Sequence, residues 1–196
     1  LAPPDEGFLA DLRQEGLRSL LGAYARQWGA DERLAEGLVQ GGNSSLPVLR
    51  EEYSRLFGAW QEKISLVEST YKPWTGDRQC GMVFAASKGL VMGDPALHMR
   101  ELYRQSSLEV PEEYRSMPDH LCLEMEFLAL LYRWAAPEQI ARFIADHLDW
   151  IAELEESVGK AAAHPFYRSA VELLHLFLRC ETRNGKVTDH GQKTIH

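Results

Sequence analysis

The chain has 196 residues, of which 45% are hydrophobic and 26% are charged, as in an ordinary soluble globular protein. Its formal net charge of −8 argues against nucleic acid as a partner, because nucleic-acid-binding surfaces usually carry a basic patch. No apolar run is long enough to span a bilayer, so we expect no stable insertion into a membrane.

Three helices are predicted in the first 57 residues. Apolar residues recur at helical spacing over 5–28, and Asp5 suits the positive end of that helix. A second helix is expected at about 31–39, ended by a glycine-rich turn at 41–45. The third, Leu46–Phe57, places its leucines and aromatic residues on one side.

The segment 58–78 shows no clean helical periodicity. Loops of this length inside compact domains are usually functional or disordered, and this one is too apolar for disorder because it contains Trp60, Tyr71 and Trp74. It must therefore pack against the protein or cover something. One interpretation is an ordered lid over the core, and the other is an aromatic wall for a bound peptide.

Two helices and a connector follow this segment. The first helix is predicted over about 79–92, with its apolar residues facing inward. The second is predicted over 94–106, where Asp94 suits the N-cap and Pro95 the first helical position. The connector at about 107–118 contains prolines and several charges, and we interpret it as a hinge.

The central helix is predicted to begin near Asp119, directly after Pro118. At about 100° per residue, apolar side chains cover most of its circumference, which is typical of a buried helix. His120 and Glu124 interrupt this apolar surface one turn apart, and a buried imidazole or carboxylate needs a partner. One interpretation is a satisfied core pair, and the other is a polar floor in an apolar groove that receives a partner.

The C-terminal third of the chain predicts two more helices, at about 137–158 and from Pro165 to about 181. His147 lies in the buried stripe of the first, and we expect it to have a backbone or carboxylate partner. The acidic outer face of that helix is typical of a solvated surface, although it could also attract a basic peptide.

The predicted fold class is therefore all-α, a single-domain bundle of about eight helices. We expect one domain over 1–181, with the hinge at about 107–118 and a polar, frayed tail at 182–196.

The cysteines and the N-terminus both favour a cytoplasmic protein. The first residues are acidic and show no hydrophobic signal core. The three cysteines fit no zinc or redox spacing, which favours reduced thiols. They are Cys80, Cys122 and Cys180.

The sequence contains no motif for a phosphate-cradling loop, a serine nucleophile elbow or a zinc protease. Two classes of function stay open. The first is a binding protein whose groove accepts an apolar peptide with a basic end. The second is a helical metal-binding protein or enzyme that uses His120, Glu124 and His147, because bundle cores can host such sites.

The start of the central helix resembles the signature of the TorD/DmsD/NarJ family, which consists of cytoplasmic chaperones for molybdenum-cofactor redox enzymes. The matching residues are Pro118-Asp119-His120-Leu121 and Glu124-Met125-Glu126-Phe127-Leu128. Met117 stands where the family often has Glu, and the usual spacer before Asp119 is absent. Two further segments carry the resemblance, Glu52-Tyr53-Ser54-Arg55-Leu56-Phe57 and Glu68-Ser69-Thr70-Tyr71 with Trp74.

The resemblance implies a cytoplasmic chaperone with no catalytic activity and no cofactor of its own. Its partners would be the catalytic subunit of a molybdopterin oxidoreductase and the N-terminal twin-arginine signal peptide of that subunit. The chaperone would assist cofactor insertion and delay export until assembly. The family's hinge also allows exchange of halves between chains, so we expect a monomer or a domain-swapped homodimer.

A twin-arginine signal suits a site of this kind because arginine pairs bidentately with carboxylates and an apolar run prefers an apolar groove. The residues that the resemblance places in the peptide site come from the hinge, the central helix and the preceding loop. They are Pro118, Asp119, His120, Glu124, Ser69, Tyr71 and Trp74.

Overall fold

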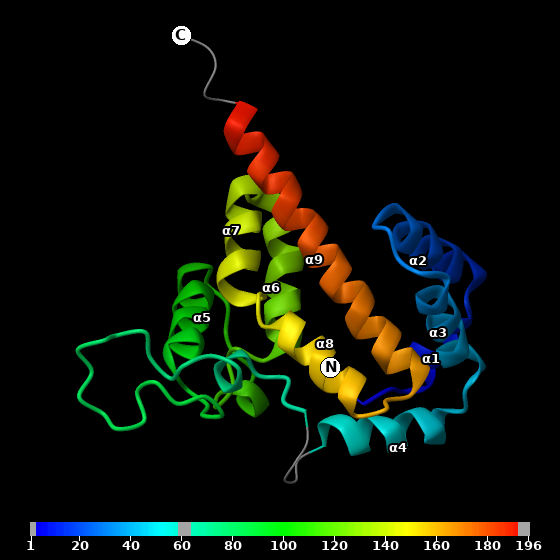
Figure 1. Ribbon diagram of the computed structural model, residues 1–196, viewed down its shortest axis with the longest axis horizontal. Coiled ribbons are helices and arrows are strands. Elements are labelled where there is room, and N and C mark those ends of the chain that lie inside the picture. The colour runs from blue at the N-terminus through cyan, green and yellow to red at the C-terminus, as the bar shows by residue number, and fades with distance from the viewer. Residues whose placement is uncertain (1–2, 59–63, 192–196) are drawn as a thin grey trace. The chain divides into compact units, whose positions relative to one another are not determined.

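The computed structural model describes residues 3–58 and 64–191 (Figure 1). These residues form nine α-helices and two short 3-10 helices, which confirms the predicted all-α class. None of the helices in the described ranges is long and apolar enough to cross a membrane. Trp60, which the sequence places in the apolar loop, lies outside the described residues.

The chain divides into two compact units. We call residues 65–150 the signature unit, and residues 2–64 with 151–187 the terminal unit. That both units form a single domain over 1–181 stays a prediction.

The terminal unit is built from four N-terminal helices and two C-terminal ones. These are α1 (Glu6–Arg13), α2 (Glu15–Gln27), α3 (Glu32–Asn43), α4 (Leu46–Phe57), α8 (Ile151–Lys160) and most of α9 (Pro165–Gly191). Helix α4 confirms its predicted bounds. The core of the unit consists of Leu9, Leu12, Ala25, Leu34, Leu38, Leu46, Leu49, Leu56, Phe166 and Tyr167.

The single helix predicted over 5–28 is wrong, because the chain breaks at Gln14, whose backbone is extended (ψ 124°).

Helix α3 ends later than predicted. It continues through Gly41 and Gly42 to Asn43, where the sequence predicted a glycine-rich turn. These glycines lie where other backbone and side chains come close: a Cβ on Gly42 would meet the Leu12 carbonyl oxygen at 3.0 Å. Close packing of helices, not turn formation, explains glycine at these positions.

Gly37→Ala tests this close packing in α3. A Cβ at Gly37 would lie 2.8 Å from the backbone carbonyl oxygen of Pro165 and would also meet the side chain of Ser169. We expect the variant to lower the free energy of unfolding by about 2–3 kcal/mol, measured by urea denaturation. Gly16→Ala in α2 is the matched control, because a Cβ there meets nothing within 4 Å. Equal urea midpoints for the two variants would contradict the close approach.

The C-terminal helix is longer than predicted. Helix α9 continues past 181 to Gly191, so the expectation of a frayed tail from Thr182 is wrong for the described part. The Thr182 hydroxyl donates to the carbonyl oxygen of Leu178 at 2.9 Å, a contact that a Thr side chain makes inside a continuing helix. The last five residues, 192–196, lie outside the described residues.

The signature unit contains three α-helices and two 3-10 helices. These are η1 (Glu68–Thr70), α5 (Asp94–Gln105), η2 (Glu112–Tyr114), α6 (Leu121–Trp134) and α7 (Pro137–His147). Phe127 of α6 lies at the centre, with its ring 5.5 Å from that of Tyr103 in α5 and 5.3 Å from that of Phe143 in α7. Most leucine and phenylalanine side chains of α6 are buried, which confirms the predicted buried helix, although Trp134 at its end is 59% exposed.

The helix predicted over 79–92 is wrong: the described chain forms a long irregular loop between η1 and α5, drawn in green in Figure 1. Its backbone groups bond across the loop instead of along a helix, from Trp74 N to the Ser87 carbonyl oxygen at 3.0 Å and from Thr75 N to that of Ala85 at 3.0 Å. Gly89 has a positive φ of 84°, which also breaks a helix. The apolar residues that suggested a buried stripe are exposed. They are Met82, Val83, Ala86, Leu90 and Val91.

Asp94 does not cap α5 as predicted, because the helix begins at Asp94 itself and Gly93 is the N-cap. The Asp94 carboxylate accepts hydrogen bonds from the Thr75 hydroxyl at 2.7 Å and from Gly76 N at 2.8 Å. The residue therefore ties the loop to the start of the helix.

The helix predicted over 137–158 is two helices. Helix α7 ends at His147 and belongs to the signature unit, whereas α8 begins at Ile151 and belongs to the terminal unit. The indole N–H of Trp150 donates to the carbonyl oxygen of His147 at 2.9 Å. This side chain satisfies a carbonyl at the end of α7 and closes the turn between the helices.

Candidate functional site

Two of the segments that carry the family resemblance meet at the start of α6, although they are about 50 residues apart in the chain. They are Glu68-Ser69-Thr70-Tyr71 and Pro118-Asp119-His120-Leu121. An isolated antiparallel bridge joins Val67 to His120. On either side of it, Glu68 N donates to the Asp119 carbonyl oxygen at 3.0 Å and Leu121 N donates to that of Leu66 at 2.8 Å. We call this junction the latch, because it fixes the segment 66–69 to the beginning of the central helix.

Asp119 is the side chain that completes the latch. Its Oδ2 accepts hydrogen bonds from Ser69 N at 2.7 Å and from the Ser69 hydroxyl, and both residues are completely buried. Burial raises the pKa of Asp119, and the two bonds from Ser69 oppose that rise. The carboxylate thus joins Ser69 to the residues that precede α6.

His120 is the N-cap of α6. Its Nδ1 accepts a hydrogen bond from Cys122 N at 3.2 Å, and its ring lies 5.0 Å from that of Tyr114. The interpretation of His120 and Glu124 as a core pair is wrong, because His120 bonds to the backbone of its own helix and Glu124 accepts from Trp150. Burial lowers the pKa of His120 to about 4, so the ring is neutral at pH 7.

The low pKa of His120 makes stability depend on pH. The unfolded chain binds a proton near the ordinary pKa of 6.5, and the folded chain binds it only near pH 4. Because the unfolded state binds more protons in this window, stability falls as the pH is lowered through it. We expect a loss of about 1–2 kcal/mol after allowing for the partial exposure of the ring.

His120→Asn tests this pH dependence, since Asn caps helices well and does not titrate. We expect the variant to match the wild type near pH 7 and to lose less stability between pH 6.5 and pH 4. The measurement is the urea midpoint at each pH. An identical loss in both proteins would show that His120 is not its source.

Glu124 lies inside the signature unit and is completely buried. The indole N–H of Trp150 donates to its Oε2 at 3.3 Å, and its Oε1 has no hydrogen-bond partner among the described residues. Burial, together with the neighbouring carboxylate of Glu68, raises the pKa of Glu124 well above its usual range.

Glu68 is the centre of a buried polar cluster. Its Oε2 lies 2.9 Å from Nδ1 of His147, which confirms the predicted carboxylate partner of this histidine. Its Oε1 lies 2.6 Å from Nζ of Lys72. The other ring nitrogen of His147 lies 2.7 Å from Nδ1 of His98. The cluster therefore links η1, α5 and α7.

Lys72 connects this cluster to the turn after α7. Its Nζ lies 2.6 Å from the Asp149 carboxylate and donates to the Asp146 carbonyl oxygen at 2.7 Å. Burial alone would lower the pKa of Lys72, but Glu68 and Asp149 outweigh it and raise the pKa overall. The lysine therefore stays charged in a half-buried position.

Three predicted site residues remain: Tyr71, Trp74 and Pro118. Tyr71 stacks on Trp150 with ring centroids 4.9 Å apart and donates its hydroxyl hydrogen to the Ser65 carbonyl oxygen at 2.8 Å. Trp74 is half-buried, and its ring meets the edge of Phe84 at 5.0 Å. Pro118 is buried, and its carbonyl oxygen accepts from the Tyr103 hydroxyl at 3.0 Å. All seven predicted site residues lie in the signature unit, and the side chains of Ser69, Asp119 and Glu124 are completely buried.

Sequence reasoning missed Glu68, Lys72 and His98 as members of the site. The spacing of Glu68 and Lys72, four residues apart with opposite charges, is a signal for a local ion pair. His98 carries no such signal, because its contact with His147 spans 49 residues of chain.

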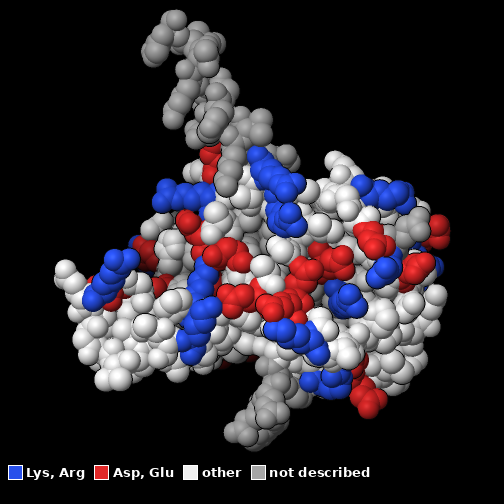
Figure 2. All heavy atoms as spheres, viewed as in Figure 1, with Lys and Arg blue, Asp and Glu red and all other residues white. Residues whose placement is uncertain are grey.

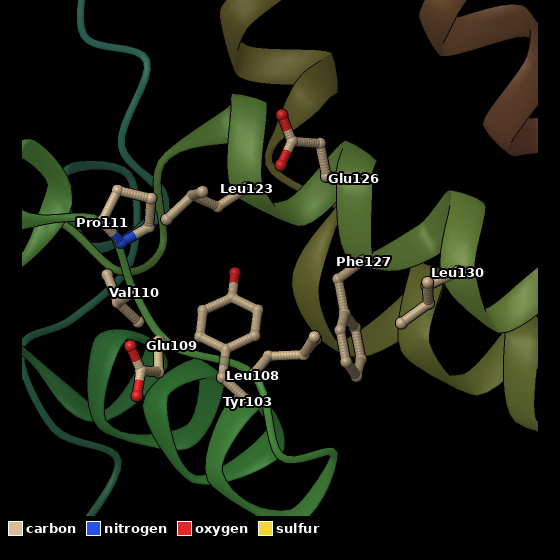
Figure 3. A pocket seen from close by; sticks show the side chains of 9 residues that line it. All are labelled: Tyr103, Leu108, Glu109, Val110, Pro111, Leu123, Glu126, Phe127 and Leu130. Carbon is tan, nitrogen blue, oxygen red and sulfur yellow. The ribbon is translucent and has the colours of Figure 1, made fainter.

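A pocket of about 200 Å³ opens beside the latch, between the end of α5, the connector and α6 (Figure 3). Its apolar lining consists of Tyr103, Leu108, Val110, Pro111, Leu123, Phe127 and Leu130. Glu109 from the connector and Glu126 from α6 also line it, and Figure 3 shows them on either side of Tyr103. Among the described residues, no lysine or arginine lines this pocket, which therefore combines apolar surface with two carboxylates.

A second pocket, of about 480 Å³, lies between α5, α6 and α7. Phe127 separates the two pockets and lines both. Here the lining includes His98, His147, Arg142 and Asp146, so the buried polar cluster reaches a surface opening at this point. On the face drawn in Figure 2, acidic and basic side chains are interspersed.

The described residues form an all-helical protein. The segment 66–69 is hydrogen-bonded to the start of the buried helix α6, beside an apolar pocket that also contains two carboxylates. The chain belongs to the family described as nitrate reductase delta subunit, whose sequence profile matches residues 13–164. This confirms the TorD/NarJ-type family that the sequence resembles.

Among curated relatives, the chain is similar to the chaperone protein TorD of Shewanella piezotolerans, with 28% identity over 85 residues. That match covers 43% of this chain and 40% of the relative. The chaperone protein TorD of Vibrio cholerae serotype O1 is 29% identical over 118 residues, which cover 53% of this chain and 54% of the relative. The chain thus spans about half the length of the curated relatives it matches, or less.

Proposed function

We propose that this protein is a cytoplasmic chaperone for a molybdopterin-containing oxidoreductase. It binds the N-terminal, twin-arginine type signal peptide of the catalytic subunit, assists cofactor insertion and delays export until assembly is complete. Membership of the family and the chaperone names of its relatives support this proposal. It acts by binding, without catalysis and without a cofactor of its own.

The single observation that carries the peptide-binding part is the chemistry of the pocket beside the latch. An apolar residue of the signal peptide fits the aromatic and aliphatic lining, and an adjacent arginine reaches Glu109 or Glu126 on the rim. Charge complementarity of this kind favours a basic-apolar peptide over an acidic one.

The signature residues set the shape of this pocket. Pro118 holds the hydroxyl of Tyr103, which is part of the lining, and Asp119 with Ser69 fixes the point from which α6 begins. One turn later, α6 supplies Leu123, Glu126 and Phe127 to the pocket wall. We therefore propose a positioning role for the buried side chains of the latch and for Glu124. Direct contact of His120, Tyr71 and Trp74 with the peptide stays a prediction, and so does exchange of halves through the hinge.

The partner is tested by co-purification of the tagged protein from its source cells grown anaerobically. We expect the catalytic subunit of a molybdopterin oxidoreductase that still carries its N-terminal leader. Recovery of the chaperone alone, or with an unrelated protein, would contradict the proposed partner.

The pocket is tested with a fluorescent peptide that contains two adjacent arginines before an apolar run. The double variant Glu109→Gln with Glu126→Gln should weaken binding at least about tenfold, and the loss should shrink at high salt because screening already weakens the charge pairs. The matched control is Glu113→Gln with Glu138→Gln, which removes the same charge at exposed positions outside the pocket. Equal weakening by both double variants would show that the pocket is not the peptide site.

A further inference from the structure

We infer that Glu68, Glu124 and His147 form a binding site for a divalent transition metal ion, with Zn²⁺ the best match. This inference is independent of the proposed peptide binding. One ligand atom from each residue lies within 4.8 Å of the others, and all three side chains are buried. Two carboxylates and one imidazole are a donor set that zinc accepts in proteins.

This ligand set differs by one residue from the set of His120, Glu124 and His147 that the sequence left open. Of that set, Glu124 and His147 do lie together, but His120 caps α6 with its ring nitrogen. Glu68 takes the third position, because η1 places it between α6 and α7. Its Oε2 already lies 2.9 Å from Nδ1 of His147.

The second ring nitrogen of His147 supports a ligand role for the first. Nε2 lies 2.7 Å from Nδ1 of His98, and a metal-bound histidine usually has a hydrogen-bond partner of this kind that orients its ring. If Nε2 carries the hydrogen, the lone pair of Nδ1 faces the carboxylate of Glu68. In that tautomer, Nδ1 of His147 and Oε2 of Glu68 offer two lone pairs to one ion.

Few cations lie at this cluster: among the described residues, Lys72 contacts it through the carboxylates of Glu68 and Asp149. In addition, Oε1 of Glu124 is buried and has no hydrogen-bond partner among the described residues, so an acceptor is available for the ion.

The second pocket gives the ion a path to the cluster, since His98 and His147 both line it. Three protein ligands leave one position of a tetrahedral zinc ion for water. Bound there, the ion would join η1, α6 and α7 and thereby stabilise the signature unit.

The test starts from full-length protein that has been treated with a chelator and dialysed. Titration with Zn²⁺ alone in a calorimeter should give one tight site per chain, and the melting temperature should rise when Zn²⁺ is added. Glu124→Gln keeps the size of the side chain and an oxygen for Trp150, and it should weaken Zn²⁺ binding at least about tenfold. Glu138→Gln, at an exposed position of α7 outside both pockets, is the matched control and should bind as the wild type does.

Cobalt provides an independent readout. Co²⁺ in the wild type should give the visible absorption of a tetrahedral site, and Glu124→Gln and His147→Gln should both lose it. Circular dichroism in the presence of chelator shows whether the variants are folded. Absence of a tight site in the wild type, or equal binding by wild type and folded Glu124→Gln, would overturn the inference. Binding of the arginine-containing peptide in chelator would still test the proposed function separately.

Discussion

Glu68→Ala is expected to lower the free energy of unfolding by about 3–5 kcal/mol. The change removes the partner of two buried groups, because Glu68 lies 2.9 Å from Nδ1 of His147 and 2.6 Å from Nζ of Lys72. The alanine leaves the half-buried Lys72 with Asp149 as its one remaining carboxylate partner. Urea denaturation followed by circular dichroism, in chelator so that metal does not contribute, measures the loss.

Glu156→Ala is the control for this effect. Glu156 forms an ion pair with Lys160 at 2.5 Å, but both side chains are more than half exposed. Exposed pairs of this kind contribute little, so we expect no measurable change in the urea midpoint. A small effect of Glu68→Ala, similar to that of Glu156→Ala, would show that the buried cluster does not stabilise the fold.

Asp119→Ala is expected to lower the free energy of unfolding by about 2–4 kcal/mol and to open the latch. The backbone N–H and the hydroxyl of Ser69 both donate to this carboxylate, and the alanine leaves two buried donors without an acceptor. Besides the urea midpoint, amide hydrogen exchange of Ser69 and Leu121 should accelerate, because these amides lie in the latch.

Ser69→Ala separates the two bonds of Asp119. It removes the hydroxyl but keeps the backbone donor at 2.7 Å, so its effect on stability and on amide exchange should be clearly smaller. The double variant of Asp119 and Ser69 should show a non-additive loss, as expected for side chains in direct contact. Equal effects of the two single variants would mean that the backbone bond contributes nothing.

Local signals in the sequence predicted the elements that local forces decide. Leu46–Phe57 has the predicted bounds, and the apolar circumference of 121–134 correctly indicated a buried helix. The partner type of His147 also followed from sequence, because a histidine in a buried stripe requires one.

The errors occurred where distant contacts decide the structure. The apolar residues of 79–92 suggested a buried helical stripe, but their backbone bonds to residues 70–75 hold an exposed loop instead. In the same way, the pairing of His120 with Glu124 followed from helical spacing, whereas the structure makes His120 a cap and brings Glu124 close to Glu68. No local pattern shows that residues 68 and 124 are neighbours in space.

The division of the chain into two units has a consequence for its biosynthesis. Residues 65–150 form one continuous stretch, whereas the terminal unit is assembled from 2–64 and 151–187. A ribosome therefore releases all of 65–150 before it has made the second half of the terminal unit. Because domains fold as units during synthesis, the stretch with the latch and the pocket can fold first. The core of the terminal unit is complete only when α9 has supplied Phe166 and Tyr167.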